Sequence, residues 1–217
     1  MFSSKRKDTQ EFRFSSESGI SLVELLVAIT LMSIAIVGIT SMLMMTMRTQ
    51  DTINAGFRSQ LDTRKVLYDM ELQVSESKKS AANGQYAIFQ ADAISVPTQE
   101  GNWVTYEYVT PPGESSPTLM RVFTANRPAS LPVTPSSSDT KLINVGTNSD
   151  ITTAVNRASP SAPIFRFYGS TGSAISAPVS NTRNVRSIKV EFSVTESKGH
   201  AEGESTVSST QINLRNY

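Results

Sequence analysis

The feature that most constrains the fold is an uninterrupted apolar run near the N-terminus. From Leu25 to Met47 the chain has 23 consecutive residues without a formal charge. As an α-helix with a rise of about 1.5 Å per residue, this run spans roughly 35 Å, enough to cross the hydrocarbon core of a bilayer. An ordinary secretory signal peptide has an apolar region of only about 7 to 15 residues. The run therefore predicts a membrane-spanning helix.

A carboxylate stands at the start of this run. Glu24 immediately precedes Leu25, and an uncompensated charge inside a membrane helix costs about 2.5 to 3.5 kcal/mol on insertion scales. In an ordinary single-pass protein the side chain would reach back to the membrane interface. In the other interpretation it is paired with an opposite charge in surroundings of low dielectric constant. Glu24 therefore requires either a partner or a function.

The residues around Glu24 match a known processing signal. The stretch GISLVELLVAI, which begins at Gly19, resembles the signal of type IV prepilins: a glycine, a hydrophobic residue, then T/S-L-[IV]-E-L. The resemblance implies that a prepilin peptidase in the membrane cuts between Gly19 and Ile20. It further implies N-methylation of the new amino terminus at Ile20, and an assembly charge pair between Glu24 and that amine on a neighbouring subunit.

The same resemblance implies a division of the chain into four parts. We expect a cytoplasmic leader peptide at 1–19 that is removed, a transmembrane and filament-core helix at 20–47, an amphipathic helix at 48–80, and a β-rich extracytoplasmic head at 81–217. The basic residues Lys5, Arg6 and Lys7 favour a cytoplasmic N-terminus by the positive-inside rule. The expected location is the bacterial cytoplasmic (inner) membrane, crossed once, and later a filament or its tip.

Beyond Met47 the sequence becomes amphipathic. Large apolar residues recur at intervals typical of one helical face: Ile53, Phe57, Leu61, Tyr68 and Leu72. We predict that the helix continues to about Ser77 and that this stripe packs on the protein's own sheet; the alternative is packing on a neighbouring subunit. The remaining faces carry charges, interpreted as solvated: Asp51, Asp62, Arg64, Lys65, Asp69 and Glu71.

The rest of the chain alternates with the period of two that is typical of strands. Strands are predicted at Ile94 to Val96, Val104 to Tyr108, Thr118 to Phe123, Lys141 to Val145, Ile164 to Tyr168, Ile188 to Val194 and Thr206 to Arg215. Pro and Ser cluster in three loops, at 110–117, 126–140 and 158–163. We interpret 126–140 as a surface insertion, with a binding loop as the alternative. The predicted fold class is α+β, a long N-terminal helix packed on an antiparallel β-rich head, as in pilins.

Features of the head narrow the resemblance to the minor subunits of this family. The segments WVTYEY, LMRVF, LINVG, FRFYGSTG, VRSIKVEFSV and STQINLRN follow in an order similar to J-type minor pseudopilins of type II secretion and to W-type minor pilins. Ser41 stands where major pilins often carry a proline, so no kink is expected. The implied partners are other major and minor pilins or pseudopilins and the inner-membrane assembly platform. Type II secretion, type IV pili and DNA uptake remain equally compatible.

The chain offers few candidate residues for catalysis. The chain has no cysteine and a single histidine, His200, which excludes thiol nucleophiles and makes a histidine triad improbable. His200, Glu202 and Glu204 were considered as metal ligands, but a solvated hairpin tip is favoured because Gly-flanked loops rarely hold a preorganised site. Gly169 to Gly172 is a turn that lacks the lysine of a phosphate loop. We expect no enzyme activity, no cofactor and no metal.

A different class of function remains open. An uncleaved, single-pass, membrane-anchored extracellular binding protein would contact glycan or DNA through Trp103 or the long loops. The aromatic residues Trp103, Tyr106 and Tyr108 could stack on such a ligand, although packing in the sheet core against the helix is favoured. With 20 basic and 19 acidic residues, the chain has no overall field that would attract nucleic acid. The sequence gives no positive support for DNA or glycan.

Overall fold

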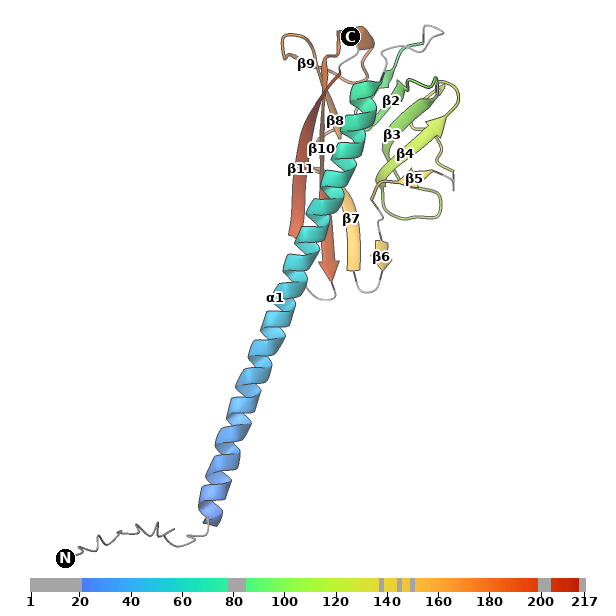
Figure 1. The fold of residues 1–217 in the computed structure, drawn as a ribbon. Helices are drawn as coiled ribbons and strands as arrows, with labels where there is room; N and C mark the ends of the chain where they lie inside the picture. Colours follow the sequence, from blue (N-terminus) through green and yellow to red (C-terminus); the bar gives the residue numbers. More distant parts are fainter. Residues whose placement is uncertain are drawn as a thin grey trace, which may run out of the picture. The chain divides into compact units, whose positions relative to one another are not determined.

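The structure is a computed structural model that describes residues 21–77, 85–136, 139–143, 146–148, 151–198 and 204–214. The chain divides into two compact units between Thr46 and Met47. Figure 1 shows the order of the helices and strands along the chain.

One α-helix, α1, runs from Leu22–Glu76 and contains 55 residues. No proline interrupts it, since the first proline of the chain is Pro97, and proline is the residue that most often kinks or ends a helix. Because α1 ends at Glu76, the predicted end near Ser77 is confirmed. In the described part of the chain α1 is the one helix long and apolar enough to cross a membrane by length and composition.

The first sheet is antiparallel and, in the described residues, has the strand order β1-β2-β3-β4-β5. Its strands are β1 Ile88–Phe89, β2 Ala93–Pro97, β3 Trp103–Val109, β4 Thr118–Thr124 and β5 Thr140–Lys141. The strands predicted around Val96, Tyr106 and Val122 are confirmed. The strand predicted at 141–145 is wrong where it can be checked, because β5 ends at Lys141 and the next two residues form no strand; 144–145 lie outside the described residues.

The second sheet is also antiparallel and is built around its longest described strand, β10. Its strands are β6 Gly146–Asn148, β7 Ile151–Arg157, β8 Phe165–Tyr168, β9 Ala174–Ile175, β10 Ser187–Lys198 and β11 Glu204–Asn213. β10 pairs with β11 along one edge and with β7 and β8 along the other. The predictions for β8, β10 and β11 are confirmed. β7 was missed because its apolar residues, Ile151, Ala154 and Val155, do not alternate.

The two sheets and the later turns of α1 share one hydrophobic core. Val66, Met70 and Val74 of α1 are buried in it, and Figure 1 shows this part of the helix lying against both sheets. Phe89 and Phe167, one from each sheet, stack with ring centroids 5.2 Å apart. Each fully buried aliphatic or aromatic side chain contributes about 1.5 to 3 kcal/mol of hydrophobic stabilisation.

The face of α1 that meets the head is not the predicted one. The stripe Ile53, Phe57, Leu61, Tyr68 and Leu72 is 42 to 69% exposed, so the prediction that it packs on the protein's own sheet is wrong. The buried helix residues are Ala55, Gly56, Ser59, Thr63, Val66, Met70, Val74 and Ser75. At about 100° per residue, these residues centre on nearly the opposite face. Small side chains let the helix backbone approach the sheet, and the Ser59 hydroxyl donates to the Val194 carbonyl at 3.0 Å.

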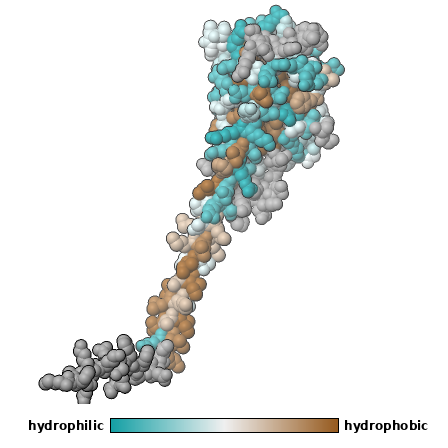
Figure 2. Space-filling view, viewed as in Figure 1, coloured by the Kyte–Doolittle hydropathy of each residue, from teal (hydrophilic) through white to brown (hydrophobic). Residues whose placement is uncertain are grey.

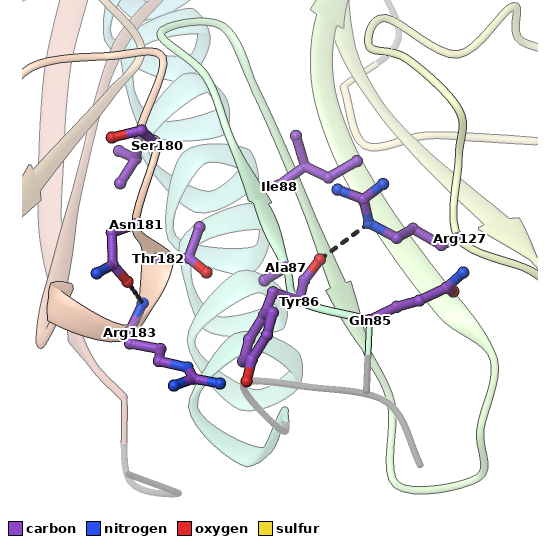
Figure 3. A pocket seen from close by; sticks show the side chains of 10 residues that line it. Gln85, Tyr86, Ala87, Ile88, Arg127, Ser180, Asn181, Thr182 and Arg183 are labelled. Carbon is purple, nitrogen blue, oxygen red and sulfur yellow. Dashed lines mark hydrogen bonds between the residues drawn. The ribbon is translucent and has the colours of Figure 1, made fainter. Parts of the chain in front are cut away.

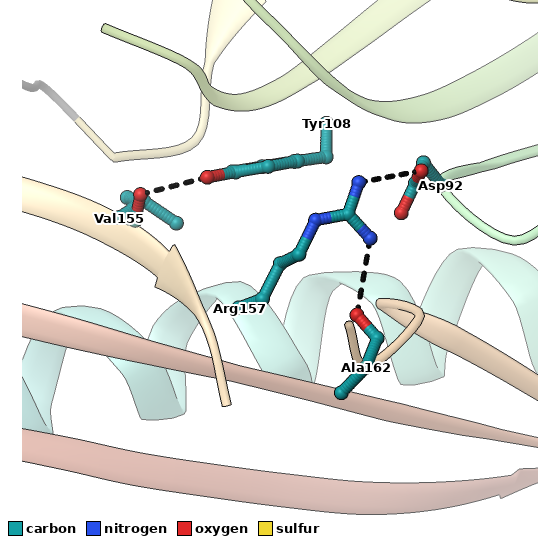
Figure 4. Close-up of polar contacts among 5 residues, drawn as sticks. All are labelled: Asp92, Tyr108, Val155, Arg157 and Ala162. Atoms are coloured by element: carbon teal, nitrogen blue, oxygen red, sulfur yellow. Dashed lines mark hydrogen bonds and ion pairs between the residues drawn. The ribbon is translucent and has the colours of Figure 1, made fainter. Parts of the chain in front are cut away.

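A polar cluster around Arg157 joins the two sheets (Figure 4). From β7, its guanidinium donates to the Asp92 carboxylate at 2.7 Å and to the Ala162 carbonyl at 3.0 Å. It also lies 5.5 Å from the centre of the Tyr108 ring. The Tyr108 hydroxyl donates back to the Val155 carbonyl on β7 at 3.0 Å. These contacts fix one sheet relative to the other beside the apolar core.

Candidate functional site

The start of α1 is a reciprocal capping arrangement. The Ser21 backbone N–H donates to Glu24 Oε2 at 3.0 Å, and the Glu24 backbone N–H donates to Ser21 Oγ at 3.2 Å. This capping box pairs two groups at a helix start that would otherwise lack partners, and it holds a carboxylate at the positive end of the helix dipole. Gly19 and Ile20, the predicted cleavage residues, lie outside the described residues.

The hydroxyl groups in the apolar run that follows form hydrogen bonds within the helix itself. Thr30, Ser33, Thr40 and Thr46 each donate to the carbonyl four residues earlier, at 2.8 to 2.9 Å. Hydrogen bonds of this kind satisfy polar side chains where no water is available. Glu24 is the one formally charged residue between Ser21 and Met47. Figure 2 shows the predominantly hydrophobic surface of this unit in brown.

The second candidate feature is the apolar stripe on α1. Its most exposed members are Tyr68 at 69%, Ile53 at 63% and Phe57 at 61%. Single exposed apolar residues are common, but a run of large ones along one helical face marks an interaction surface. The opposite face of α1 is already occupied by the head, so the stripe is the surface of this helix that remains accessible to another molecule.

Most of the charged residues of this part of α1 are exposed, but Asp69 is not merely solvated. Its carboxylate accepts from the Tyr106 hydroxyl at 3.0 Å and from Arg121 at 2.6 Å. Burial, followed by the neighbouring Asp69 charge, raises the pKa of Tyr106 above its ordinary value. The prediction of a wholly solvated charged face is therefore wrong at Asp69, which ties α1 to β3 and β4. Asp62, Arg64, Lys65 and Glu71 are exposed as predicted.

The three aromatic residues considered for ligand stacking lie in the sheet. Tyr106 is fully buried and points toward α1, as predicted. Trp103 is 1% exposed, but it stands three residues away on the same strand and therefore faces the opposite side of the sheet. Packing against the helix is thus wrong for Trp103. Tyr108 is partly buried between the two sheets. None of the three offers an open ring face.

A polar recess of about 590 Å³ lies beside Tyr86 (Figure 3). Arg183 stacks over the Tyr86 ring at 4.4 Å, and Arg127 Nε donates to the Tyr86 carbonyl at 3.0 Å. Among its described lining residues there is no acidic residue, histidine or cysteine, and such residues are the usual general bases that activate a hydroxyl nucleophile.

Of the three residues considered for metal binding, the structure describes only Glu204. Glu204 begins β11 opposite Glu196, whereas His200 and Glu202 lie outside the described residues. Across the ranges that the structure describes, no group of three or more potential metal ligands was found. Gly169 to Gly172 forms the predicted turn, closed by a hydrogen bond from Gly172 N–H to the Gly169 carbonyl at 3.1 Å.

Comparison with known proteins gives one match. Residues 14–40 match a family model described as the prokaryotic N-terminal methylation motif. No curated protein and no solved structure matches the chain. The matched segment contains Gly19, Ile20 and the capped Glu24.

The motif and the apolar helix together support a type IV prepilin-like protein, a class of structural rather than enzymatic proteins. They fit a single-pass anchor in the inner membrane. This motif implies processing by prepilin peptidase and assembly with other pilins.

Proposed function

We propose that this protein is a pilin or pseudopilin subunit, cut between Gly19 and Ile20 and methylated at Ile20, that assembles into a filament through α1. The observation that carries the proposal is the capped Glu24, which lies within the matched motif and directly before 23 uncharged residues. An ionisable residue at the edge of a membrane span is a functional candidate by default, and the capping box alone does not require a charge, because a glutamine at this position would complete it as well.

Two surfaces of α1 would serve assembly. Glu24 would pair with the methylated amine of Ile20 on a neighbouring subunit, which compensates its charge in the membrane. In the second unit, the exposed stripe from Ile53 to Leu72 would pack against a helix of a neighbour. The stripe supports the proposal because the head leaves this face of α1 uncovered.

A minor subunit fits better than a major one. The order of the head segments is similar to J-type pseudopilins and W-type minor pilins, and the chain lacks cysteine. The head would lie outside the cytoplasm, and the partners would be prepilin peptidase, other pilins or pseudopilins and the inner-membrane assembly platform. The protein would then work in the shaft or tip of a type II secretion pseudopilus or type IV pilus.

Mass analysis of the N-terminus tests the proposal. Mature protein should begin at Ile20 and be heavier than the unmodified fragment by one methyl group, and Gly19→Leu should block the cut because the small residue at the junction is lost. Ser18→Leu, one residue earlier, is the matched control and should be processed. An intact junction between Gly19 and Ile20 in assembled wild-type filaments would refute the proposal and favour the uncleaved membrane-anchored binding protein.

A further inference from the structure

The first sheet has a second buried face, on the side away from α1. Successive residues of a strand point to opposite faces, so Trp103, Thr105 and Glu107 of β3 lie opposite Tyr106, which points toward the helix. All three are at most 1% exposed. Their neighbours Met120 and Val122 on β4 are also buried, yet none of these side chains belongs to the main core shared with α1. Something other than the helix covers this face.

The segment 125–136, which we call the strap, is bound to this face through the hydrogen bond from the Val133 N–H to Glu107. It leaves the end of β4 and runs back toward β5 (Figure 1). Pro128, Leu131 and Pro135 of the strap are buried although the segment has no regular secondary structure. The segment predicted as a plain surface insertion therefore contributes apolar side chains to a small second core.

The strap is held by few polar contacts. Near its start, Arg127 Nε donates to the Tyr86 carbonyl at 3.0 Å. In its middle, the Val133 backbone N–H donates to Glu107 Oε2 at 2.8 Å. At its end, the Asp139 carboxylate accepts from the Ser136 hydroxyl at 2.9 Å. The contact through Glu107 is the one that links the strap directly to the covered face of the sheet.

Glu107 is an unfavourable place for a negative charge. The residue is 0% exposed, and its second carboxylate oxygen is buried without a hydrogen-bond partner. Burial raises the pKa of Glu107 from 4.5 to about 7, against the lowering effect of the Val133 N–H. An ionised carboxylate buried with one oxygen unpaired is costly, so the closed strap favours the protonated acid.

The charges near Glu107 do not neutralise it. Its partners on the neighbouring strands are Ala93 and Met120, which carry no charge, and Val133 of the strap carries none either. Asp139, just beyond the strap, raises the pKa of Glu107 further.

The nearby cations are engaged elsewhere. Lys141 of β5 is paired with Glu114. The strap's own Arg127 is bound to the Tyr86 carbonyl. Among the described residues, the charged group that shifts the pKa of Glu107 is the anion Asp139 rather than a cation.

We propose that residues 125–136 form a pH-sensitive strap, latched by Glu107, that covers and uncovers the Trp103 face of the first sheet. The inference is independent of the proposed role in filaments. When the strap opens, Glu107 gains water and its pKa returns toward 4.5.

The direction of the response follows from the two protonation states. Below pH 4.5 both the open and the closed form are protonated. Between pH 4.5 and about 7 the open form loses its proton while the closed form keeps it. Rising pH therefore favours opening, and the effect levels off above pH 7. Since each pKa unit corresponds to a tenfold change and the two pKa values differ by about 2.5 units, the ratio of open to closed form should rise by roughly 300-fold.

Trp103 provides the measurement because it is the only tryptophan in the chain. In the full-length protein in detergent, acrylamide quenching of Trp103 fluorescence should increase as the pH rises from 4.5 to 7 and then reach a plateau. Glu107→Gln has the shape of the protonated acid and cannot ionise, so its quenching should stay low and flat. Glu196→Gln removes another buried carboxylate with a raised pKa, on β10, and should follow the wild type.

A rise in quenching in Glu107→Gln equal to that of the wild type would overturn the proposal. If Glu107→Gln loses its fold, as judged by circular dichroism, Asp139→Asn decides instead. Removing the Asp139 charge lowers the pKa of Glu107 in the closed form, so the plateau should be reached at a lower pH and the total increase should be smaller. A quenching curve for Asp139→Asn that coincides with the wild-type curve would also count against the strap.

Discussion

At the scale of single residues, Glu24 has a partner within its own helix. The sequence suggested a carboxylate that needs an opposite charge, whereas the structure shows it accepting a hydrogen bond from the Ser21 backbone. The capping box does not remove the negative charge. It holds that charge in the first turn of α1, four residues after Ile20, the predicted new amino terminus. Capping and charge pairing are therefore separable roles of one side chain.

Two substitutions should separate these roles. Glu24→Gln keeps an oxygen that can accept from the Ser21 N–H but removes the charge, so membrane insertion should persist while co-purification with other pilin subunits falls by an order of magnitude. Ser21→Ala removes the hydroxyl that caps the helix, at a cost of about 1 kcal/mol, and should largely retain co-purification. Pull-down from detergent-solubilised membranes measures both. Normal recovery of partners with Glu24→Gln would show that the charge pair is not needed.

At the scale of elements, α1 has two different faces in the second unit. Small residues such as Gly56 and Ser59 meet the head, and large ones such as Phe57 and Leu61 face outward. Counting large apolar residues selected the wrong face, because burial here depends on close approach of the backbones. The recurrence of small residues at 55, 59 and 63 was the signal that could have identified the packed face.

Substitutions on the two faces should affect different properties: stability on the face that meets the head, and assembly on the outer face. Ser59→Leu places a larger side chain in a fully buried site and removes the hydrogen bond to Val194, so it should lower the free energy of unfolding by about 1 to 3 kcal/mol. Phe57→Ser should change that free energy by less than about 0.5 kcal/mol but reduce assembly with partner subunits. Urea denaturation and filament yield are the measurements.

The control for the outer stripe is Val207→Ser on β11, where the apolar residue is 55% exposed but lies off the helix. It should leave both stability and filament yield unchanged. Equal loss of filaments with Phe57→Ser and Val207→Ser would mean that the stripe has no special role.

At the scale of the whole molecule, the chain separates into a first unit that contains the apolar run and a second, folded unit that begins at Met47. The residues of the main core run from Val66 to Leu214, so none of them comes from the apolar run. The folded unit thus contains the main core, whereas the described residues of the first unit, 21–46, are all exposed. The first unit depends on a membrane or on other subunits.

A fragment of residues 47–217 should therefore fold by itself. We expect a soluble protein that unfolds in one cooperative transition, with a stability in the usual range of about 5 to 15 kcal/mol, and with Trp103 fluorescence that is protected from quenching at pH 4.5. Urea denaturation followed by circular dichroism and by fluorescence should give coincident curves. Broad or separate transitions would contradict a single self-contained core.

The sequence by itself determined the long apolar helix, the methylation motif around Glu24 and most of the longer strands. These features depend on local patterns: an uncharged run, a fixed spacing from glycine to glutamate, and alternation along a strand. The tertiary structure decided which face of α1 packs, that Asp69 binds Tyr106 and Arg121, and that residues 125–136 cover the Trp103 face. Each of these outcomes joins residues far apart in the chain, so a pattern within one segment can indicate which of its residues pack but not which distant residues they will meet.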